Sequence, residues 1–299
     1  MPGGGDFAGL EYGLPVGLLR PGGDELKLRP GAASLTLALL GALAWVAATP
    51  AAETVLVHRT VVVGRSVDGR PITAIEIGDP AASDKALVVG CIHGTECAGI
   101  AVANRLTAMA ARPGFDLWVV PDLNPDGDAA GMRGNAHGVD LNRNFPWRWK
   151  HLKGVFFSGP RPLSEPESRF VYHLILRIRP KVSIWFHQHL DVVDESGGSL
   201  AVEREFAAVA GLPLKRLARE PGSVVGWENH LLRSGTAFVV ELPAGALSLQ
   251  ATARLTRAVL AVTGGAGSTR SQLVSHASSG RIDGIPSAAF RAFLAAARG

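Results

Sequence analysis

The sequence predicts an α/β fold: a mixed, mostly parallel twisted β-sheet with helices on both faces. Apolar runs typical of buried strands alternate along the chain with segments of helical periodicity. No internal repeat is visible, and 299 residues with 47% hydrophobic content suffice for one sizeable core. A second full domain is not required.

The first elements are two strands with hairpin-like spacing, over residues 55–63 and 72–77. The run over residues 86–92 has the uninterrupted apolar character of a strand that is buried on both faces. A helix over residues 97–111 and a strand over residues 117–121 follow it. This order predicts a strand–helix–strand unit at the centre of the sheet.

The Ser-Glu-Pro-Glu segment at residues 164–167 reads as a capping box with proline in the first turn, which predicts a helix start. The helix places Phe170, Leu174 and Ile178 on its inner side and ends before Pro180. The remaining elements are expected in this order: a strand over 182–186, a helix near 204–210, a strand over 237–241 and a helix over 246–262.

The two ends of the chain differ in composition from the middle. Residues 1–25 are rich in glycine and proline and are expected to be disordered. Residues 27–52 combine a basic flank, an apolar centre and small residues at the end, which predicts a signal peptide or an uncleaved anchor. A buried helix is the alternative. We therefore expect a folded domain over residues 53–263, a Gly/Ser-rich linker and tail over 264–299, and export rather than a cytoplasmic location.

The formal net charge is +4, and the basic residues are scattered along the chain. Without a basic run or a nucleic-acid-binding module, a nucleic-acid partner is not expected. Membrane contact is expected only through the possible N-terminal anchor.

A candidate metal site follows the strand over residues 86–92. His93 and Glu96 form an H-x-x-E pair, and His187 ends a later buried strand. Two histidines and one glutamate are the ligands of an open zinc site, which leaves a position for water and predicts hydrolysis. One Zn²⁺ per chain is expected. His189 competes with His187, because residues two apart on a strand share a face.

The chain also carries Asn-Pro-Asp-Gly at 124–127, Arg133, Gly-Val-Asp-Leu-Asn-Arg-Asn-Phe at 138–145 and Trp-Phe-His-Gln at 185–188. With these motifs the sequence resembles the zinc carboxypeptidase family of the carboxypeptidase A type, and looks closest to its bacterial branch of murein peptide amidases and γ-D-glutamyl-diaminopimelate peptidases. The similarity covers most of residues 55–262. It implies a zinc metallopeptidase.

The resemblance implies a role for each matched residue. Glu241 would be the general base and then acid, and Arg133 would stabilise the oxyanion. Asn142 and Arg143 would hold the free carboxylate of the substrate, and Asp140 would orient the first histidine ligand. Glu241 also follows an apolar run, where a carboxylate is costly without a function or a partner. A structural pairing of Glu241 with an arginine is the alternative.

The substrate is expected to be a short peptide of the cell wall. Tyr12 and Tyr172 are the two tyrosines of the chain, so the mobile substrate-binding tyrosine of the digestive enzymes has no counterpart before Glu241. This departure resembles the murein amidase branch and predicts cleavage of an amide in murein peptides, such as the γ-D-glutamyl-diaminopimelate bond. The alternatives are an acyl-amino-acid hydrolase of the aspartoacylase and succinylglutamate desuccinylase type and a non-catalytic peptide-binding module.

Cys91 and Cys97 are the two cysteines, and they flank the proposed metal pair. In an oxidising compartment they could form a disulfide that braces the turn. We expect instead two small buried thiols.

Overall fold

The computed structural model describes residues 55–112 and 114–264. The expected leader, signal peptide and C-terminal tail lie outside the described residues, so their boundaries stay predictions. The described residues form one sheet. Its strands are β1 (Val57–Arg65), β2 (Pro71–Gly78), β3 (Lys85–Val89), β4 (Asp116–Val120), β5 (Val182–Gln188), β6 (Val192–Asp194), β7 (Leu214–Lys215) and β8 (Thr236–Leu242).

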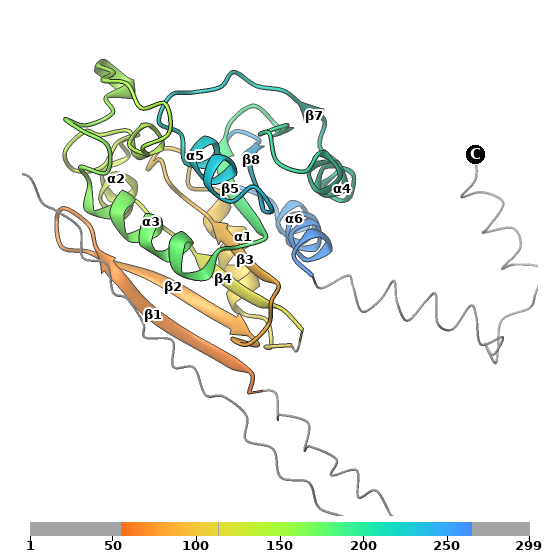
Figure 1. The fold of residues 1–299 in the computed structure, drawn as a ribbon. Helices are drawn as coiled ribbons and strands as arrows, with labels where there is room; N and C mark the ends of the chain where they lie inside the picture. The colour runs from red at the N-terminus through yellow and green to blue at the C-terminus, as the bar shows by residue number, and fades with distance from the viewer. Residues whose placement is uncertain (1–54, 113, 265–299) are drawn as a thin grey trace, which may run out of the picture. The chain divides into compact units, whose positions relative to one another are not determined.

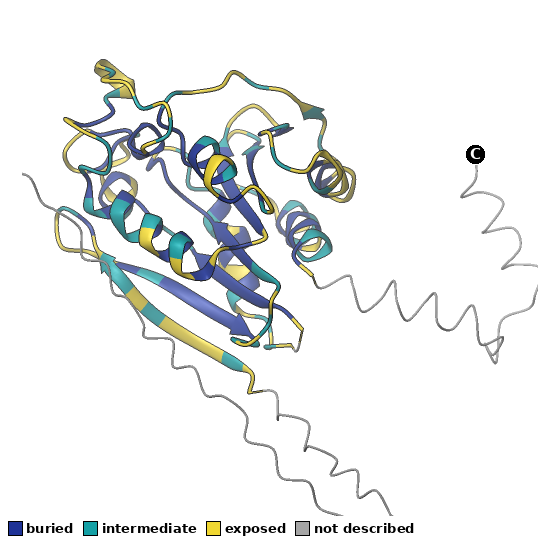
Figure 2. Cartoon of the chain, viewed as in Figure 1, coloured by how far each residue is buried: buried dark blue, intermediate teal, exposed yellow. Residues whose placement is uncertain are grey.

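The strand order across the sheet is β1-β2-β4-β3-β5-β8-β6-β7. The four central strands β4, β3, β5 and β8 run parallel, and β1, β2 and β6 add antiparallel pairings on either side (Figure 1). The predicted mixed, mostly parallel sheet is therefore confirmed. Burial rises from the edge strand β1 to the interior strands (Figure 2), as the apolar runs predicted.

Helices cover both faces of the sheet. They are α1 (Gly99–Thr107), α2 (Pro125–Ala130), α3 (Pro166–Ile178), α4 (Leu200–Ala210), α5 (Val224–Leu231) and α6 (Leu249–Val262), with short 3-10 turns η1 (Leu141–Arg143) and η2 (Gly154–Phe156). Successive strand residues point to opposite faces. Val88 and Phe186 therefore pack with α1, α4 and α6, whereas Val89 and Trp185 pack with α3 and α5.

The start of α3 is where predicted, but its expected capping box is wrong. The N-cap residue is Glu165, and no side chain caps the helix. Ser164 donates instead to the Glu165 carboxylate, and Glu167 accepts from the Val67 amide at 3.0 Å and from Asn135. Glu167 thus joins the helix to the β1–β2 hairpin, because tertiary donors compete with the local cap.

Several boundaries differ from the prediction. The strand expected over 86–92 ends at Val89 and the helix expected over 97–111 begins at Gly99, because the intervening turn carries the candidate metal pair. Asn124 caps a short helix, α2, by accepting from the Gly127 amide. Helix α5 and the short strands β6 and β7 were not predicted.

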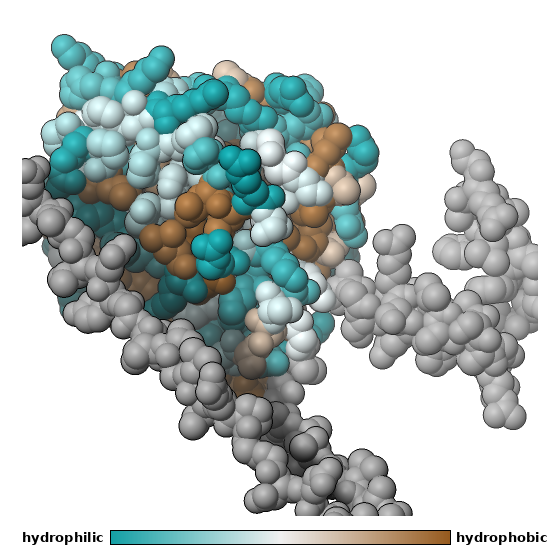
Figure 3. Space-filling model, in the orientation of Figure 1, coloured by the Kyte–Doolittle hydropathy of each residue, from teal (hydrophilic) through white to brown (hydrophobic). Residues whose placement is uncertain are grey.

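The face that carries α3 is largely polar, with apolar side chains gathered near its middle (Figure 3). Among the helices of residues 55–112 and 114–264, none has the length and apolar character that a membrane crossing requires.

Candidate metal and active site

The candidate residues lie at the C-terminal edge of the parallel strands. His93 and Glu96 occupy the turn after β3, and His187 lies near the end of β5. In the next strand, Glu241 of β8 is the register partner of His187. Open α/β sheets bind ligands at this edge, because the loops there leave a crevice.

The turn from β3 to α1 packs too tightly to accept larger residues. A Cβ atom on Gly94 would lie 2.0 Å from the Gly127 carbonyl carbon at the start of α2. Cys91 and Cys97 form a disulfide around the same turn. The expectation of two free thiols is therefore wrong. The two cysteines lie close enough to join because the turn folds back on itself between them.

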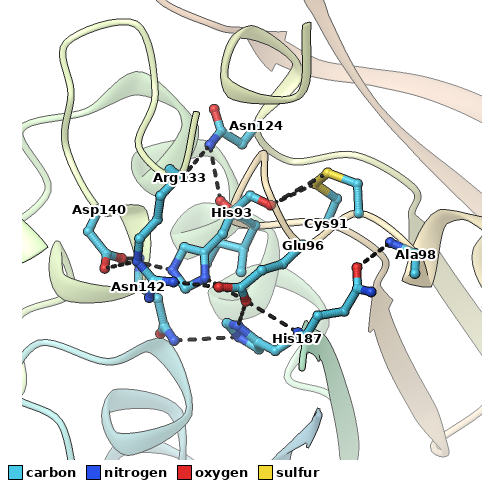
Figure 4. A network of polar contacts seen from close by, with 12 residues as sticks. Cys91, His93, Glu96, Ala98, Asn124, Arg133, Asp140, Asn142 and His187 are labelled. Carbon is cyan, nitrogen blue, oxygen red and sulfur yellow. Dashed lines mark hydrogen bonds and ion pairs between the residues drawn. A yellow bond between two sulfur atoms is a disulfide. The ribbon is translucent and has the colours of Figure 1, made fainter. Parts of the chain in front are cut away.

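His93, Glu96 and His187 meet in one cluster (Figure 4). One ligand atom from each lies within 4.8 Å of the others. The Nδ1 atoms of His93 and His187 both lie 3.0 Å from Oε2 of Glu96. Both histidines are buried. Two imidazole nitrogens and a carboxylate that converge in this way suit a divalent metal such as zinc. His189 is exposed and is not part of the cluster.

Asp140 lies behind His93. Its Oδ1 is 2.9 Å from Nε2 of His93, which leaves Nδ1 facing Glu96. Arg133 donates from Nε to Oδ2 of Asp140 at 3.0 Å, and its Nη1 bonds to Glu96. Burial alone would raise the pKa of Asp140, but His93, Arg133 and Arg143 hold that pKa below its usual range. Asp140 is therefore charged and fixes the orientation of the ring.

The pKa values of the two histidines are shifted in opposite directions. Burial would lower the pKa of His93, but Asp140 and Glu96 outweigh it and the pKa is raised. Burial lowers the pKa of His187, which favours the neutral imidazole that binds metals. The pKa of Glu96 is lowered by both histidines despite its burial. The cluster thus supplies a carboxylate between two imidazoles.

Asn142 and Arg143 come from η1, next to the cluster. Asn142 Oδ1 accepts from the Val224 amide at 3.0 Å, and its Nδ2 lies 3.5 Å from Nε2 of His187. Arg143 is buried, and its Nη2 lies 3.3 Å from the carboxylate of Glu220. Within the described residues, the buried Nε of Arg143 has no hydrogen-bond partner. A guanidinium held in this way can bind a carboxylate.

Glu241 is partly buried at the end of β8. Its Oε2 is likewise without a hydrogen-bond partner within the described part of the chain. Burial raises the pKa of Glu241, and the nearby Glu96 adds to the rise. The alternative reading, a structural pairing of Glu241 with an arginine, receives no support among the ion pairs of residues 55–112 and 114–264.

One cavity of about 450 Å³ joins these groups. Glu96, Arg133, Asn142, Arg143, His187 and Glu241 all line it. The cavity is also lined by Asp194, Arg219 and Glu220, which sequence reasoning missed. Asp194 and Arg219 are 25 residues apart, and no local pattern relates them. In the sequence, the one indication of this pair is that an aspartate, Asp194, ends the short apolar run of β6.

Phe156 was also missed. It lies in η2, and the guanidinium carbons of Arg133 and Arg143 lie 5.6 and 5.3 Å from its ring centroid. Cation–π contacts at these distances help to hold both arginines in place.

Known proteins resemble this chain in sequence and in fold. A sequence profile for the zinc carboxypeptidases matches residues 43–194. Murein peptide amidase A of Escherichia coli (strain K12) is 34% identical over 184 residues, which cover 55% of this chain and 74% of that protein. Murein peptide amidase A of Vibrio campbellii is 30% identical over 198 residues, covering 60% of this chain and 77% of that protein.

Solved structures agree with the sequence comparison. The crystal structure of the murein-tripeptide amidase MpaA from Escherichia coli O157 superposes with a TM-score of 0.57 at 28% identity, covering 66% of this chain and 90% of that chain. Carboxypeptidase A from Helicoverpa armigera, at 18% identity, shares the fold with a TM-score of 0.59, over 71% of this chain and 70% of that chain. Together with the profile match, these relatives place the chain in the zinc carboxypeptidase family, and it is a metallopeptidase.

Proposed function

We propose that the chain is a zinc-dependent peptidase that hydrolyses an amide bond in short murein peptides, at the γ-D-glutamyl-diaminopimelate linkage. The observation that carries the proposal is the His93, Glu96 and His187 cluster beside one cavity that Glu96, His187, Arg143 and Glu241 line. Glu241 and Arg143 each have a buried polar atom with no hydrogen-bond partner among the described residues. The similarity to murein peptide amidases supports the substrate class.

His93, Glu96 and His187 would hold one zinc ion, since their donor atoms already converge. Zinc supplies Lewis acidity, which polarises a carbonyl group and acidifies water. Asp140 fixes His93 through the 2.9 Å contact with Nε2 and so keeps Nδ1 directed at the metal position.

Glu241 acts as the general base and then as the acid. Glu241 lines the cavity, so its carboxylate can accept a proton from water there and return it to the departing amine. Its position on β8, opposite His187 in the strand register, places the carboxylate next to the metal ligands. The raised pKa, caused by burial and by Glu96, makes Glu241 a better proton acceptor than an exposed glutamate.

Arg133 and Arg143 bind the negative charges of the reacting peptide. Arg133 lines the cavity beside Glu96 and would stabilise the oxyanion that develops at the cleaved carbonyl. Arg143 and Asn142 both line the cavity, and they would hold the free carboxylate of the substrate through the guanidinium and amide donors.

Glu241→Gln tests the proposal on protein purified from about residue 53 onward. We expect kcat for L-alanyl-γ-D-glutamyl-diaminopimelate to fall by roughly a hundredfold to ten-thousandfold, because general acid–base catalysis contributes that much. Zinc content and binding of the peptide should stay near wild type. Release of diaminopimelate is followed by mass spectrometry, with and without a chelator.

Glu205→Gln is the matched control, since Glu205 is exposed on α4 and does not line the cavity. Hydrolysis that survives Glu241→Gln would show that another group is the base. Hydrolysis that survives complete removal of the metal would overturn the zinc mechanism. Peptide binding without hydrolysis in the wild type would favour a binding module.

A further inference from the structure

A charged pair, Asp194 and Arg219, lines the same cavity as the groups used above. Asp194 ends β6, which pairs antiparallel with β8 so that Val192 lies opposite Glu241. Continuing this register places Asp194 opposite Val239, two residues further into the sheet, and residues two apart share one face. Both Asp194 and Val239 line the cavity. Asp194 therefore lies roughly 7 Å from the level of Glu241 along the strands.

Asp194 is a buried carboxylate that can accept one more hydrogen bond. It accepts from the Leu217 amide at 2.8 Å, from the Ser196 hydroxyl at 2.7 Å and from Nη1 of Arg219 at 3.0 Å. An ionised carboxylate offers about four acceptor positions. One more donor, such as an ammonium group, can therefore be accommodated.

Arg219 is the partner of Asp194 and the more accessible of the two. Its side chain is 43% exposed, compared with 6% for Asp194. Nη1 binds Asp194 and Nη2 binds the backbone oxygen of Glu195, which leaves the guanidinium in the cavity wall with further N–H donors. Such a group can bind a carboxylate without giving up Asp194.

Apolar side chains line the cavity together with this pair and the groups around the metal cluster. Leu217, Val225 and Val239 line the same cavity. A straight aliphatic chain can lie against them, because burial of methylene groups there is favourable. The cavity thus offers apolar surface together with a buried anion, Asp194, and a more exposed cation, Arg219.

The loop that carries Arg219 is joined to the Arg143 region. Gly222 has a φ of 69°, and a Cβ there would lie 2.3 Å from the Arg143 carbonyl oxygen. The Phe145 amide donates to the Gly222 carbonyl at 2.9 Å. This close packing holds the backbone at Gly222, three residues after Arg219, against the Arg143 segment.

We propose that Asp194 and Arg219 select a leaving residue whose side chain is an aliphatic chain ending in both an ammonium and a carboxylate group. Asp194 binds the ammonium and Arg219 binds the carboxylate, while Arg143 and Asn142 hold the α-carboxylate. This inference rests on the proposed function and specifies how its site distinguishes a diaminopimelate-type residue from lysine-type residues.

The test uses four tripeptides, L-alanyl-γ-D-glutamyl-X, that differ only at the end of the side chain of X. Meso-diaminopimelate carries both groups, L-lysine only the ammonium, L-2-aminopimelate only the carboxylate, and L-norleucine neither. We expect Arg219→Gln to reduce the diaminopimelate-to-lysine ratio of kcat/KM by roughly tenfold to a hundredfold, the range for a charge-assisted hydrogen bond. Arg219→Lys should restore part of that ratio.

Asp194→Asn keeps the size of the side chain and tests the other half of the pair. It should lower the diaminopimelate-to-aminopimelate ratio instead. Arg216→Gln is the matched control, because Arg216 lies in the same loop and pairs with Glu195 but does not line the cavity. It should leave both ratios unchanged.

Equilibrium binding of the four free amino acids to the zinc-loaded wild type and variants provides a second readout. If the wild type hydrolyses none of the tripeptides, the proposed function fails, yet the ranking of the amino acids still tests the pair. Equal losses for all four ligands in Arg219→Gln, or unchanged ratios in protein that unfolds like wild type, would overturn the inference.

Discussion

At the scale of single residues, the arginines that line the cavity are paired with acidic residues of the chain. The negative groups of a substrate must displace these partners. Arg133 is bonded to Glu96 and Asp140, and Arg143 lies beside Glu220. Buried charges are costly without partners, so such pairs are expected in the free protein. The two partners of the Arg143–Glu220 contact differ in solvent exposure: the Arg143 side chain is 7% exposed and that of Glu220 is 45% exposed. Glu220 is therefore free to leave.

We predict that Glu220→Gln lowers KM for peptides with a free α-carboxylate. Glu220 and the substrate carboxylate compete for Arg143 at 3.3 Å, so loss of the competing charge should lower KM by about twofold to fivefold, the range for an exposed ion pair. Steady-state kinetics on the free and the C-terminally amidated tripeptide measure this effect. The amidated peptide should show no gain, and Glu195→Gln, outside the cavity lining, serves as control. An equal gain for both peptides would contradict competition at Arg143.

At the scale of elements, the turn between β3 and α1 is the segment on which the site depends most. It supplies two of the three candidate ligands, packs against α2 through Gly94 and is closed by the Cys91–Cys97 disulfide. Disulfides persist in oxidising compartments, so the bond supports a proposal that the chain is exported.

We predict that Cys91→Ala with Cys97→Ala lowers the free energy of unfolding by about 2 kcal/mol, the loop-closure value for so short a ring. Urea unfolding of the metal-free protein measures this loss, and zinc affinity should also fall because the turn must then be ordered on binding. Thiol titration of protein isolated from its cell should detect none, since these are the two cysteines of the chain. Reactive thiols in that protein, or identical unfolding of the double variant, would contradict the role of the bond.

The elements that the sequence predicts well are those with long, uniform patterns. β3 and β5 are built around apolar runs, and α3 has clear periodicity, so all three were located within a few residues. Helix α5 was not predicted because Pro221 and Gly222 before it indicate a loop. Strand β6 was not predicted because it has only three residues. The capping box failed because Glu167 binds Val67 and Asn135, which are distant in sequence.

The candidate site shows the same contrast between residues that local motifs mark and residues that only the fold brings together. His93, Glu96 and His187 were predicted because motifs mark them, and the fold brings them together. Asp194, Arg219 and Phe156 act through contacts between distant segments, and no spacing in the sequence encodes such contacts. The state of the cysteines could not be settled from sequence either, because it depends on the geometry of the turn.

At the scale of the whole molecule, the parallel sheet carries the candidate site at one edge, and a titratable carboxyl group lies buried away from it. Glu228 of α5 is buried against β5, where Ser183 donates to its carboxylate and the Trp185 indole lies at 3.4 Å. Burial raises the pKa of Glu228 to about 7, from the ordinary value of 4.5 for a glutamate. The folded chain therefore holds a proton there that the unfolded chain releases at lower pH.

We predict that this proton makes stability depend on pH. Because the folded pKa of Glu228 is raised to about 7, its contribution is fully present below the unfolded value of 4.5 and is lost as the pH rises through 7. The difference across that window is about 3 kcal/mol at most. Glu228→Gln is neutral at every pH, so the loss of stability from pH 5 to pH 8 should be smaller in the variant than in the wild type. Urea unfolding at both pH values measures the two slopes, with exposed Glu205→Gln as control. Equal slopes for wild type and Glu228→Gln would show that Glu228 ionises normally, and that Ser183 and Trp185 stabilise its charge despite burial.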